Sequence, residues 1–267
     1  MTAQVLGRSP AATATVILAG GHESGEGRAL GPRAVPAGRA LHEAVEAALD
    51  SGAAPVCVVP MTLGRDPKLI ADTARTLKWL ARGAGSGRIA LAEPFGAKDH
   101  LIGWLRAAAG RAVAAAGKEG TAVLVCAPAA GPFDDADLFR VARLVRQYGH
   151  HTWVEVAFDG GDPDIAQGVE RCRRLGAGQV ALVSAGFGPA AAQPVADAVD
   201  CGPLLAPSAV GGVIDVRTET ALHRLGHGDD GIAAGLDAEH GHGYAHSHGP
   251  GEHGHAHPHP DPQHSHH

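Results

Sequence analysis

A histidine and a glutamate follow directly on the first apolar run of the chain. Residues 16–20 (VILAG) read as a buried strand, and Gly21, His22, Glu23 and Ser24 come immediately after it. In open parallel α/β sheets, ligands bind at the carboxyl ends of the strands. A histidine, an acid and a serine at this place are candidate site residues. An ordinary strand-to-loop turn with a solvent-facing histidine is the alternative.

A second histidine occupies a comparable place. His100 follows Asp99 in the loop after another short apolar run, residues 88–92. If the loops at the strand ends converge, His100 is a further candidate residue of the same site. A histidine in a surface loop is the alternative interpretation.

Strands and helices that would position these residues alternate along the chain. Continuous apolar runs indicate buried strands, and 3.6-residue periodicity indicates helices between them. The expected strands are residues 16–20, 55–60, 88–92, 121–127, 152–158 and 179–184; the expected helices are 38–49, 69–81, 101–116, 137–148 and 164–175. Repeated βα units of this length predict an α/β fold with parallel sheets flanked by helices.

The two halves of the chain match at a constant offset. A shift of 124 positions pairs six identical residues without a gap, which favours an internal duplication. The pairs are Val45 and Val169, Glu46 and Glu170, Gly52 and Gly176, Ala53 and Ala177, Val56 and Val180, and Gly64 and Gly188. We therefore expect two duplicated lobes, at residues 13–118 and 119–222, followed by a tail at 223–267.

Composition excludes several classes of protein. A net charge of -6 without a Lys- or Arg-rich run argues against nucleic-acid binding, and no apolar run is long enough to cross a membrane. The four cysteines are widely spaced, which predicts a reduced, cytoplasmic protein. No organic cofactor is expected. The sequence leaves the oligomeric state open.

The C-terminus is rich in histidine. Eleven of the 28 residues from His240 to His267 are histidine, among Gly, Pro and Ser. Such a segment predicts a disordered tail that binds Ni²⁺, Co²⁺, Cu²⁺ or Zn²⁺ with low selectivity. Its length and mixed composition argue against an expression tag. The expected metal-binding residues are His240, His242, His246, His248, His253, His255, His257 and His259.

Four segments carry a resemblance to one enzyme family. They are residues 19–27 (AGGHESGEG), 93–105 (EPFGAKDHLIGWL), 122–145 (AVLVCAPAAGPFDDADLFRVARLV) and 154–183 (VEVAFDGGDPDIAQGVERCRRLGAGQVALV). Together they resemble the sirohydrochlorin cobaltochelatases, which are class II chelatases, over most of residues 16–216. The resemblance implies two small α/β lobes that face each other across a cleft for a tetrapyrrole, into which a divalent metal ion is inserted.

The resemblance also assigns roles to residues. His22 takes the place of the family's first metal-binding histidine, and the neighbouring carboxylate of Glu23 is the expected general base for the pyrrole protons. The second is expected in a Gly-x-His pattern after residues 55–60, where this chain has Gly64, Arg65 and Asp66. Asp66 is thus the expected second ligand, and a harder, anionic carboxylate would shift the metal preference. His100 is the candidate third ligand of this implied site, if the loops converge.

Cations beside the loops of the first half are candidates to bind the carboxylates of such a ring. Each is also explained as a solvated surface charge. These residues are Arg28, Arg33, Arg65, Lys68 and Lys98. Asp72, on the helix after the second loop, is interpreted as a surface charge.

The second half lacks matching ligands. By hand alignment, the counterparts of His22, Asp66 and His100 are Ala127, Ala190 and Ala209. We therefore expect the first lobe to carry the chemistry and the second lobe to shape the cleft.

The sequence and the resemblance predict a cytoplasmic chelatase, a lyase-type enzyme that inserts a divalent ion into sirohydrochlorin or a related tetrapyrrole. Cobalt is the expected ion. Its partners would be the ring and the metal ion. The alternatives are a chelatase for nickel or iron, and a non-catalytic nickel or cobalt carrier or storage protein that uses the histidine-rich tail.

Overall fold

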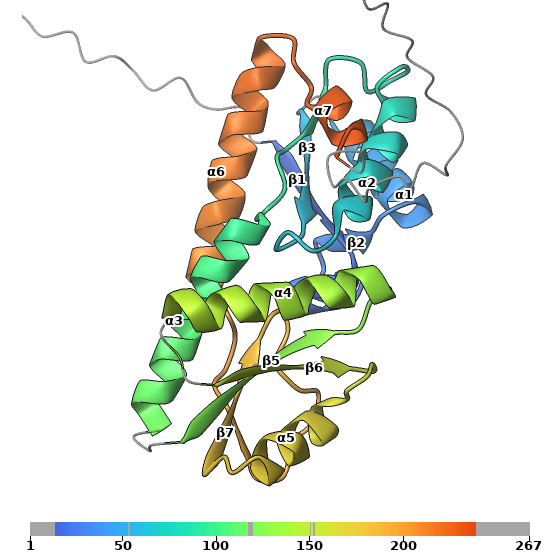
Figure 1. Ribbon diagram of the computed structural model, residues 1–267. Helices are drawn as coiled ribbons and strands as arrows, with labels where there is room; N and C mark the ends of the chain where they lie inside the picture. Colours follow the sequence, from blue (N-terminus) through green and yellow to red (C-terminus); the bar gives the residue numbers. More distant parts are fainter. Residues whose placement is uncertain (1–13, 53, 117–119, 150, 152, 239–267) are drawn as a thin grey trace, which may run out of the picture.

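The chain folds into two α/β lobes (Figure 1). The structure, a computed structural model, describes residues 14–52, 54–116, 120–149, 151 and 153–238. In the first lobe the elements are β1 (Thr15–Gly20), the short 3-10 helices η1 (His22–Ser24) and η2 (Arg28–Leu30), β2 (Ala34–Pro36), α1 (Arg39–Asp50), β3 (Val56–Met61), α2 (Pro67–Leu80) and β4 (Ile89–Leu91).

The second lobe repeats this plan after a connecting helix, α3 (Lys98–Ala116). Its elements are β5 (Thr121–Pro128), α4 (Pro132–Gly149), β6 (Val154–Asp159), α5 (Ile165–Arg174), β7 (Gln179–Ser184) and β8 (Ala198–Asp200). Two helices, α6 (Pro207–Gly226) and α7 (Ile232–Leu236), complete the described chain.

Each lobe contains one four-stranded sheet in which every neighbouring pair of strands is parallel. The orders are β2-β1-β3-β4 and β6-β5-β7-β8, so the two sheets have the same topology. Because each strand returns to the same end of its sheet through a helix or loop, the segments after β1 and β3 lie together. The expected α/β fold with two duplicated lobes is confirmed.

The six expected strands are all present, with small differences at their ends. The short edge strands β2 and β8 were not predicted, since each has only two apolar residues before a proline or an aspartate. Helix α4 begins at Pro132, five residues before its expected start. Proline fits the first turn of a helix, where no intrahelical N–H bond is needed.

Two helices pack across the boundary between the lobes. Helix α3 follows the first sheet in sequence but packs on β5 and β7 of the second sheet and against α4 (Figure 1). Conversely, α6 follows the second sheet but packs on β3 and β4 of the first sheet. One apolar core therefore joins the lobes, with Leu105 of α3, Val183 of β7 and Ala221 of α6 in a single cluster. The expected lobes, residues 13–118 and 119–222, are continuous in sequence but exchange these helices in space.

The folded part of the chain extends beyond the expected start of the tail. We expected the tail to begin at residue 223, but α6 continues to Gly226 and α7 packs on α2. Ile232 is buried, and the Leu91 amide donates a 2.8 Å hydrogen bond to the Asp230 carbonyl. Residues 223–238 therefore belong to the fold, because apolar side chains anchor them to the first lobe. The eight predicted metal-binding histidines, from His240 to His259, lie outside the described residues.

No helix in the part of the chain that the structure describes is both long enough and apolar enough to span a bilayer.

Candidate functional site between the lobes

The loop after β1 turns sharply and places His22 and Glu23 at the carboxyl end of the first sheet. Ser24 holds this turn, because its Oγ donates to the Gly21 carbonyl and accepts from the Gly27 amide. A Cβ on Gly20 would lie 2.4 Å from the Gly27 nitrogen, so only glycine fits there. The sequence is rich in glycine here because the backbone of the loop folds back against the end of β1, next to the histidine.

His22 and Asp66 form the central pair of the site. Nδ1 of His22 lies 3.0 Å from Oδ2 of Asp66, and the two side chains are 17% and 12% exposed. The close approach requires Gly21, since a Cβ there would lie 2.2 Å from the same Oδ2 atom. The structure therefore brings together the two residues that were predicted as metal ligands.

Both carboxylate oxygens of Asp66 are engaged. Oδ1 accepts a 2.9 Å hydrogen bond from the Leu69 amide and so caps the N-terminus of α2, while Oδ2 faces His22. In metal sites, a carboxylate commonly accepts a hydrogen bond from one nitrogen of a ligating histidine and leaves the other nitrogen for the ion. Nε2 of His22 is buried and has no hydrogen-bond partner among the described residues. This geometry fits Asp66 as the residue that orients His22 better than as a second ligand.

Charge stabilises the pair. Although burial disfavours an imidazolium, the hydrogen bond to Asp66 and the negative charges of Glu23 and Asp66 raise the pKa of His22. Burial also disfavours an aspartate anion, but the hydrogen bond from His22 and its positive charge lower the pKa of Asp66. Asp66 is thus held ionised beside the imidazole.

Glu23 lies beneath the pair in a fully buried position. Its Oε2 accepts hydrogen bonds from the Thr62 hydroxyl and, at 2.9 Å, from the Leu63 amide. Oε1 is buried without a partner among the described residues. Burial raises the pKa of Glu23, opposed by the charge of Arg65 and the bond from Thr62. A carboxyl group in this environment can hold and release a proton.

Arg65 is placed differently from our expectation. We expected it to be available to the carboxylates of a ligand, but its side chain is completely buried. Its Nη2 lies 3.4 Å from Oδ1 of Asp135 and 3.5 Å from the Asp134 carbonyl, both at the start of α4. Arg65 therefore balances carboxylates from both lobes, the buried Glu23 and the partly exposed Asp135, because the loop between β3 and α2 turns it inward.

The second lobe contributes the first turn of α4 to the site, which the sequence analysis missed. Burial raises the pKa of Asp134, and the charges of His22, Asp66 and Arg65 all act on this carboxyl. Lys98, a predicted ligand for ring carboxylates, instead forms an ion pair with Asp137. The available signal was the run Pro132–Asp135, which has proline at a helix start and acids in the first turn.

The lobes also meet through the backbone of the histidine loop. The Phe187 amide donates a 2.9 Å hydrogen bond to the Glu23 carbonyl, and the Phe187 ring packs edge-on against Phe95 at 5.2 Å. Residues from both lobes therefore meet at the loop that carries His22.

The remaining predicted site residues are outside this group. Lys68 pairs with Asp72 on the surface of α2, and Arg28 and Arg33 are exposed. His100 is exposed, and its Nδ1 accepts a 3.2 Å hydrogen bond from the Ala97 amide. Over the described residues, no three or more His, Cys, Asp or Glu side chains are grouped to hold a metal ion. The predicted set of His22, Asp66 and His100 is therefore not assembled.

Strand register refines the comparison between the lobes. The shift of 124 positions matches β3 with β7, and β1 and β5 run parallel to these strands. When the pairings of β1 with β3 and of β5 with β7 are aligned by this shift, Gly20 corresponds to Ala127 and His22 corresponds to Ala129. The second lobe still has alanine at this place, so the fold does not require a histidine there.

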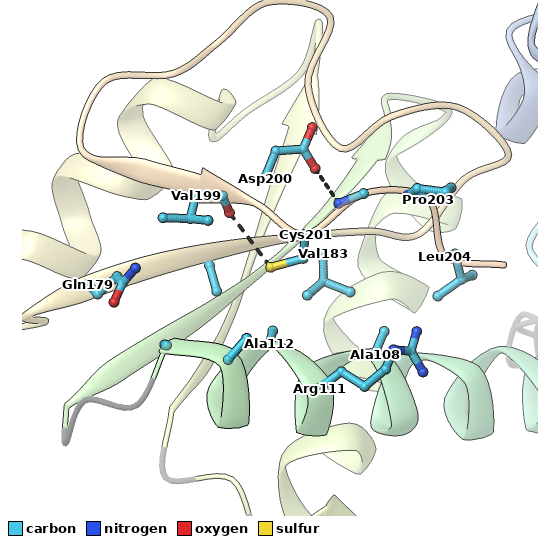
Figure 2. A pocket seen from close by; sticks show the side chains of 14 residues that line it. Ala108, Arg111, Ala112, Gln179, Val183, Val199, Asp200, Cys201, Pro203 and Leu204 are labelled. Atoms are coloured by element: carbon cyan, nitrogen blue, oxygen red, sulfur yellow. Dashed lines mark hydrogen bonds between the residues drawn. The ribbon is translucent and has the colours of Figure 1, made fainter. Parts of the chain in front are cut away.

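A separate cavity lies in the second lobe (Figure 2). It has a volume of about 340 Å³ and is lined by residues of α3, β7 and the segment around β8. Ala112 and Val183 form its walls, and Arg111, Asp200 and Cys201 supply polar groups. None of the predicted site residues lines it, so we do not assign it to the His22 chemistry.

The sequence matches no protein-family model and no curated protein. The geometry around His22 is therefore the basis for the function proposed below.

Proposed function

We propose that this protein is a cytoplasmic metal chelatase that inserts a divalent ion, most naturally Co²⁺, into sirohydrochlorin or a related tetrapyrrole. The observation that carries the proposal is the buried, unpartnered Nε2 of His22, oriented by Asp66 and next to a buried glutamate. The resemblance of residues 16–216 to the cobaltochelatases and the two-lobed fold support the same reaction class. The unpaired state of all four cysteines agrees with a reduced compartment.

Metal insertion requires three actions at one place. An ion must be held weakly and partly dehydrated, two pyrrole N–H protons must leave the ring, and the ion must then bind the ring nitrogens. In the proposal, Nε2 of His22 presents the ion, because imidazole suits Co²⁺ and Ni²⁺. Asp66 fixes the tautomer in which Nδ1 carries the proton and Nε2 has a free lone pair.

Glu23 is the proposed proton acceptor. Its Oε1 has no partner among the described residues, and burial raises the pKa of this carboxyl group, which favours its uptake of a proton. The positive charge of Arg65 opposes a further rise in the pKa of Glu23. Two protons leave each ring, so Glu23 must pass the first one on before it accepts the second.

Admission of a ring would require movement of the second lobe. The ion pair Arg65–Asp135 joins the start of α4 to the first lobe, and Lys98–Asp137 joins α3 to α4. In the proposal, a bound ring separates these groups, and its carboxylates become available partners for Lys98.

A metal carrier or storage protein is the second candidate. Two observations favour it: the described residues form no group of three or more metal ligands, and eleven histidines lie between His240 and His267. Such a protein would capture ions without insertion. Nickel or iron insertion is a variant of the chelatase proposal, because a neutral imidazole also accepts those ions.

Metal insertion can be followed by the change in the absorption spectrum of sirohydrochlorin. The full chain and a chain ending at Ala238 would each be incubated with Co²⁺, Ni²⁺ or Fe²⁺. The chelatase proposal expects both chains to accelerate insertion above the uncatalysed rate, since the truncation keeps all folded elements. If neither chain accelerates insertion while the full chain binds the ions, the carrier function replaces it.

A further inference from the structure

We propose a second transition-metal site at the C-terminus of α6, formed by His223 and His227. His223 lies in the last turn of the helix and His227, four residues later, is its C-cap residue; the centroids of the two imidazole rings are 4.7 Å apart with an interplanar angle of 71°. This site is separate from His22, and the inference is independent of the proposed chelatase activity.

The ring geometry suits one shared ion. A metal–nitrogen bond of about 2.0–2.1 Å places each ring centroid roughly 3.2 Å from the ion, so two rings at tetrahedral or right angles have centroids about 4.5–5.3 Å apart. The observed separation falls in this range. Histidines four residues apart on a helix lie on one face and can therefore act as a chelating pair.

Both rings are available to an ion. His223 and His227 are exposed, whereas Ala221, on the opposite side of the helix, is buried against the core. Within the described ranges, no hydrogen bond or ion pair engages their ring nitrogens. The nearby carboxylate of Asp229 is occupied by the side chain of Arg224, at 2.7 Å.

The end of the helix adds electrostatic attraction. Carbonyl groups at the C-terminus of a helix carry partial negative charge, which favours a cation in the last turn. His227 follows the final residue of α6, Gly226, and His223 lies one turn earlier. The ion would thus sit at the negative end of a 20-residue helix.

The histidine pair lies close in sequence to the predicted metal-binding tail. His227 precedes His240, the first histidine of the predicted tail, by 13 residues. The first lobe also packs against α6. An ion released from the tail would therefore meet a two-histidine site on the folded body of the protein. We infer that the pair receives Ni²⁺, Co²⁺ or Zn²⁺, the divalent ions that imidazole prefers.

Local hydrogen exchange of the full chain tests the site, because it separates α6 from the tail and from His22. The probe is Ni²⁺ alone, and the readout is amide exchange in residues 222–227. Ion binding to the folded helix suppresses local opening in proportion to 1 + [Ni²⁺]/Kd, so about tenfold slower exchange is expected when free Ni²⁺ is ten times Kd. Exchange in α5, which has no histidine, is the internal reference and should not change.

Substitutions make the test specific. His223→Ala and His227→Ala should each abolish the slowing in α6. Glu219 is exposed and lies four residues before His223, so Glu219→His in the His227→Ala chain rebuilds the spacing one turn earlier and should restore it. If Ni²⁺ leaves exchange in α6 of the wild type unchanged, the two rings merely pack together and the site does not exist. Equal slowing in the single variants, or no rescue by Glu219→His, would also overturn the proposal.

Discussion

Asp66 accepts a hydrogen bond at each of its two oxygens: Oδ2 lies 3.0 Å from Nδ1 of His22, and Oδ1 lies 2.9 Å from the Leu69 amide. One side chain therefore caps α2 and orients the histidine of the preceding loop. These two functions can be separated by substitution.

Asp66→Asn should preserve the cap but disturb the histidine. The amide oxygen can still accept from Leu69, whereas the NH₂ group would face Nδ1 and favour the tautomer with a proton on Nε2. Loss of such an orienting carboxylate typically costs about 10- to 100-fold in metal affinity or activity, and we expect a decrease of that size in the insertion rate.

Asp66→Ala is the matched comparison for stability. It also removes the cap, so its free energy of unfolding should fall by about 1 kcal/mol relative to the Asn variant in urea titrations. Wild-type insertion by Asp66→Asn would show that the orientation of His22 is unimportant.

Gly21→Ala tests the same contact without changing a charge. The added Cβ would lie 2.2 Å from Oδ2 of Asp66, although the backbone at Gly21 is in a conformation that alanine can adopt. The carboxylate must move, so we expect slower insertion and destabilisation by about 1–3 kcal/mol. Gly52→Ala is the control, since nothing lies within 4 Å of its Cβ position, and its stability should stay within about 0.5 kcal/mol of the wild type. Equal effects of the two substitutions would contradict the steric account.

Arg65→Met should change how stability depends on pH. The folded-state pKa of Glu23 is raised above its ordinary value of 4.5, so the folded chain binds more protons than the unfolded chain between those two values. Stability therefore falls as pH rises through that interval, by up to about 1.4 kcal/mol per pH unit. Loss of the guanidinium raises the pKa of Glu23 further and extends the fall to higher pH.

The measurement is urea unfolding of both chains at several pH values from 5 to 8. The difference between wild type and Arg65→Met should widen toward pH 8, and Glu23→Gln in the same chain should remove the widening. Parallel curves for the two chains would mean that Arg65 does not act on Glu23.

Much of this architecture follows from local sequence patterns. Apolar runs identified β1 and β3, and glycine-rich segments after β1 correctly placed His22 at a strand end. The identical residues shared at a shift of 124 positions anticipated two sheets of the same order. These features depend on periodicity and chain direction, which a single sequence contains.

Long-range packing could not be predicted in the same way. Arg65 looks like a solvent-exposed loop residue in sequence, yet α4 of the other lobe buries it. The exchange of α3 and α6 depends on which of two similar apolar sheets each helix covers, and the helix sequence alone does not distinguish them. Asp134 and Asp135 belong to the site only because the start of α4 packs against Arg65 of the first lobe.

The most direct test of the central claim is the initial rate of Co²⁺ insertion into sirohydrochlorin by His22→Ala and His100→Ala, measured beside the wild type. His22 lies in the site with a free Nε2, whereas His100 is exposed and its Nδ1 is bound to the Ala97 amide. We predict that His22→Ala reduces insertion to the uncatalysed rate while His100→Ala stays within about twofold of the wild type, as expected for a surface change. Normal insertion by His22→Ala would contradict the account.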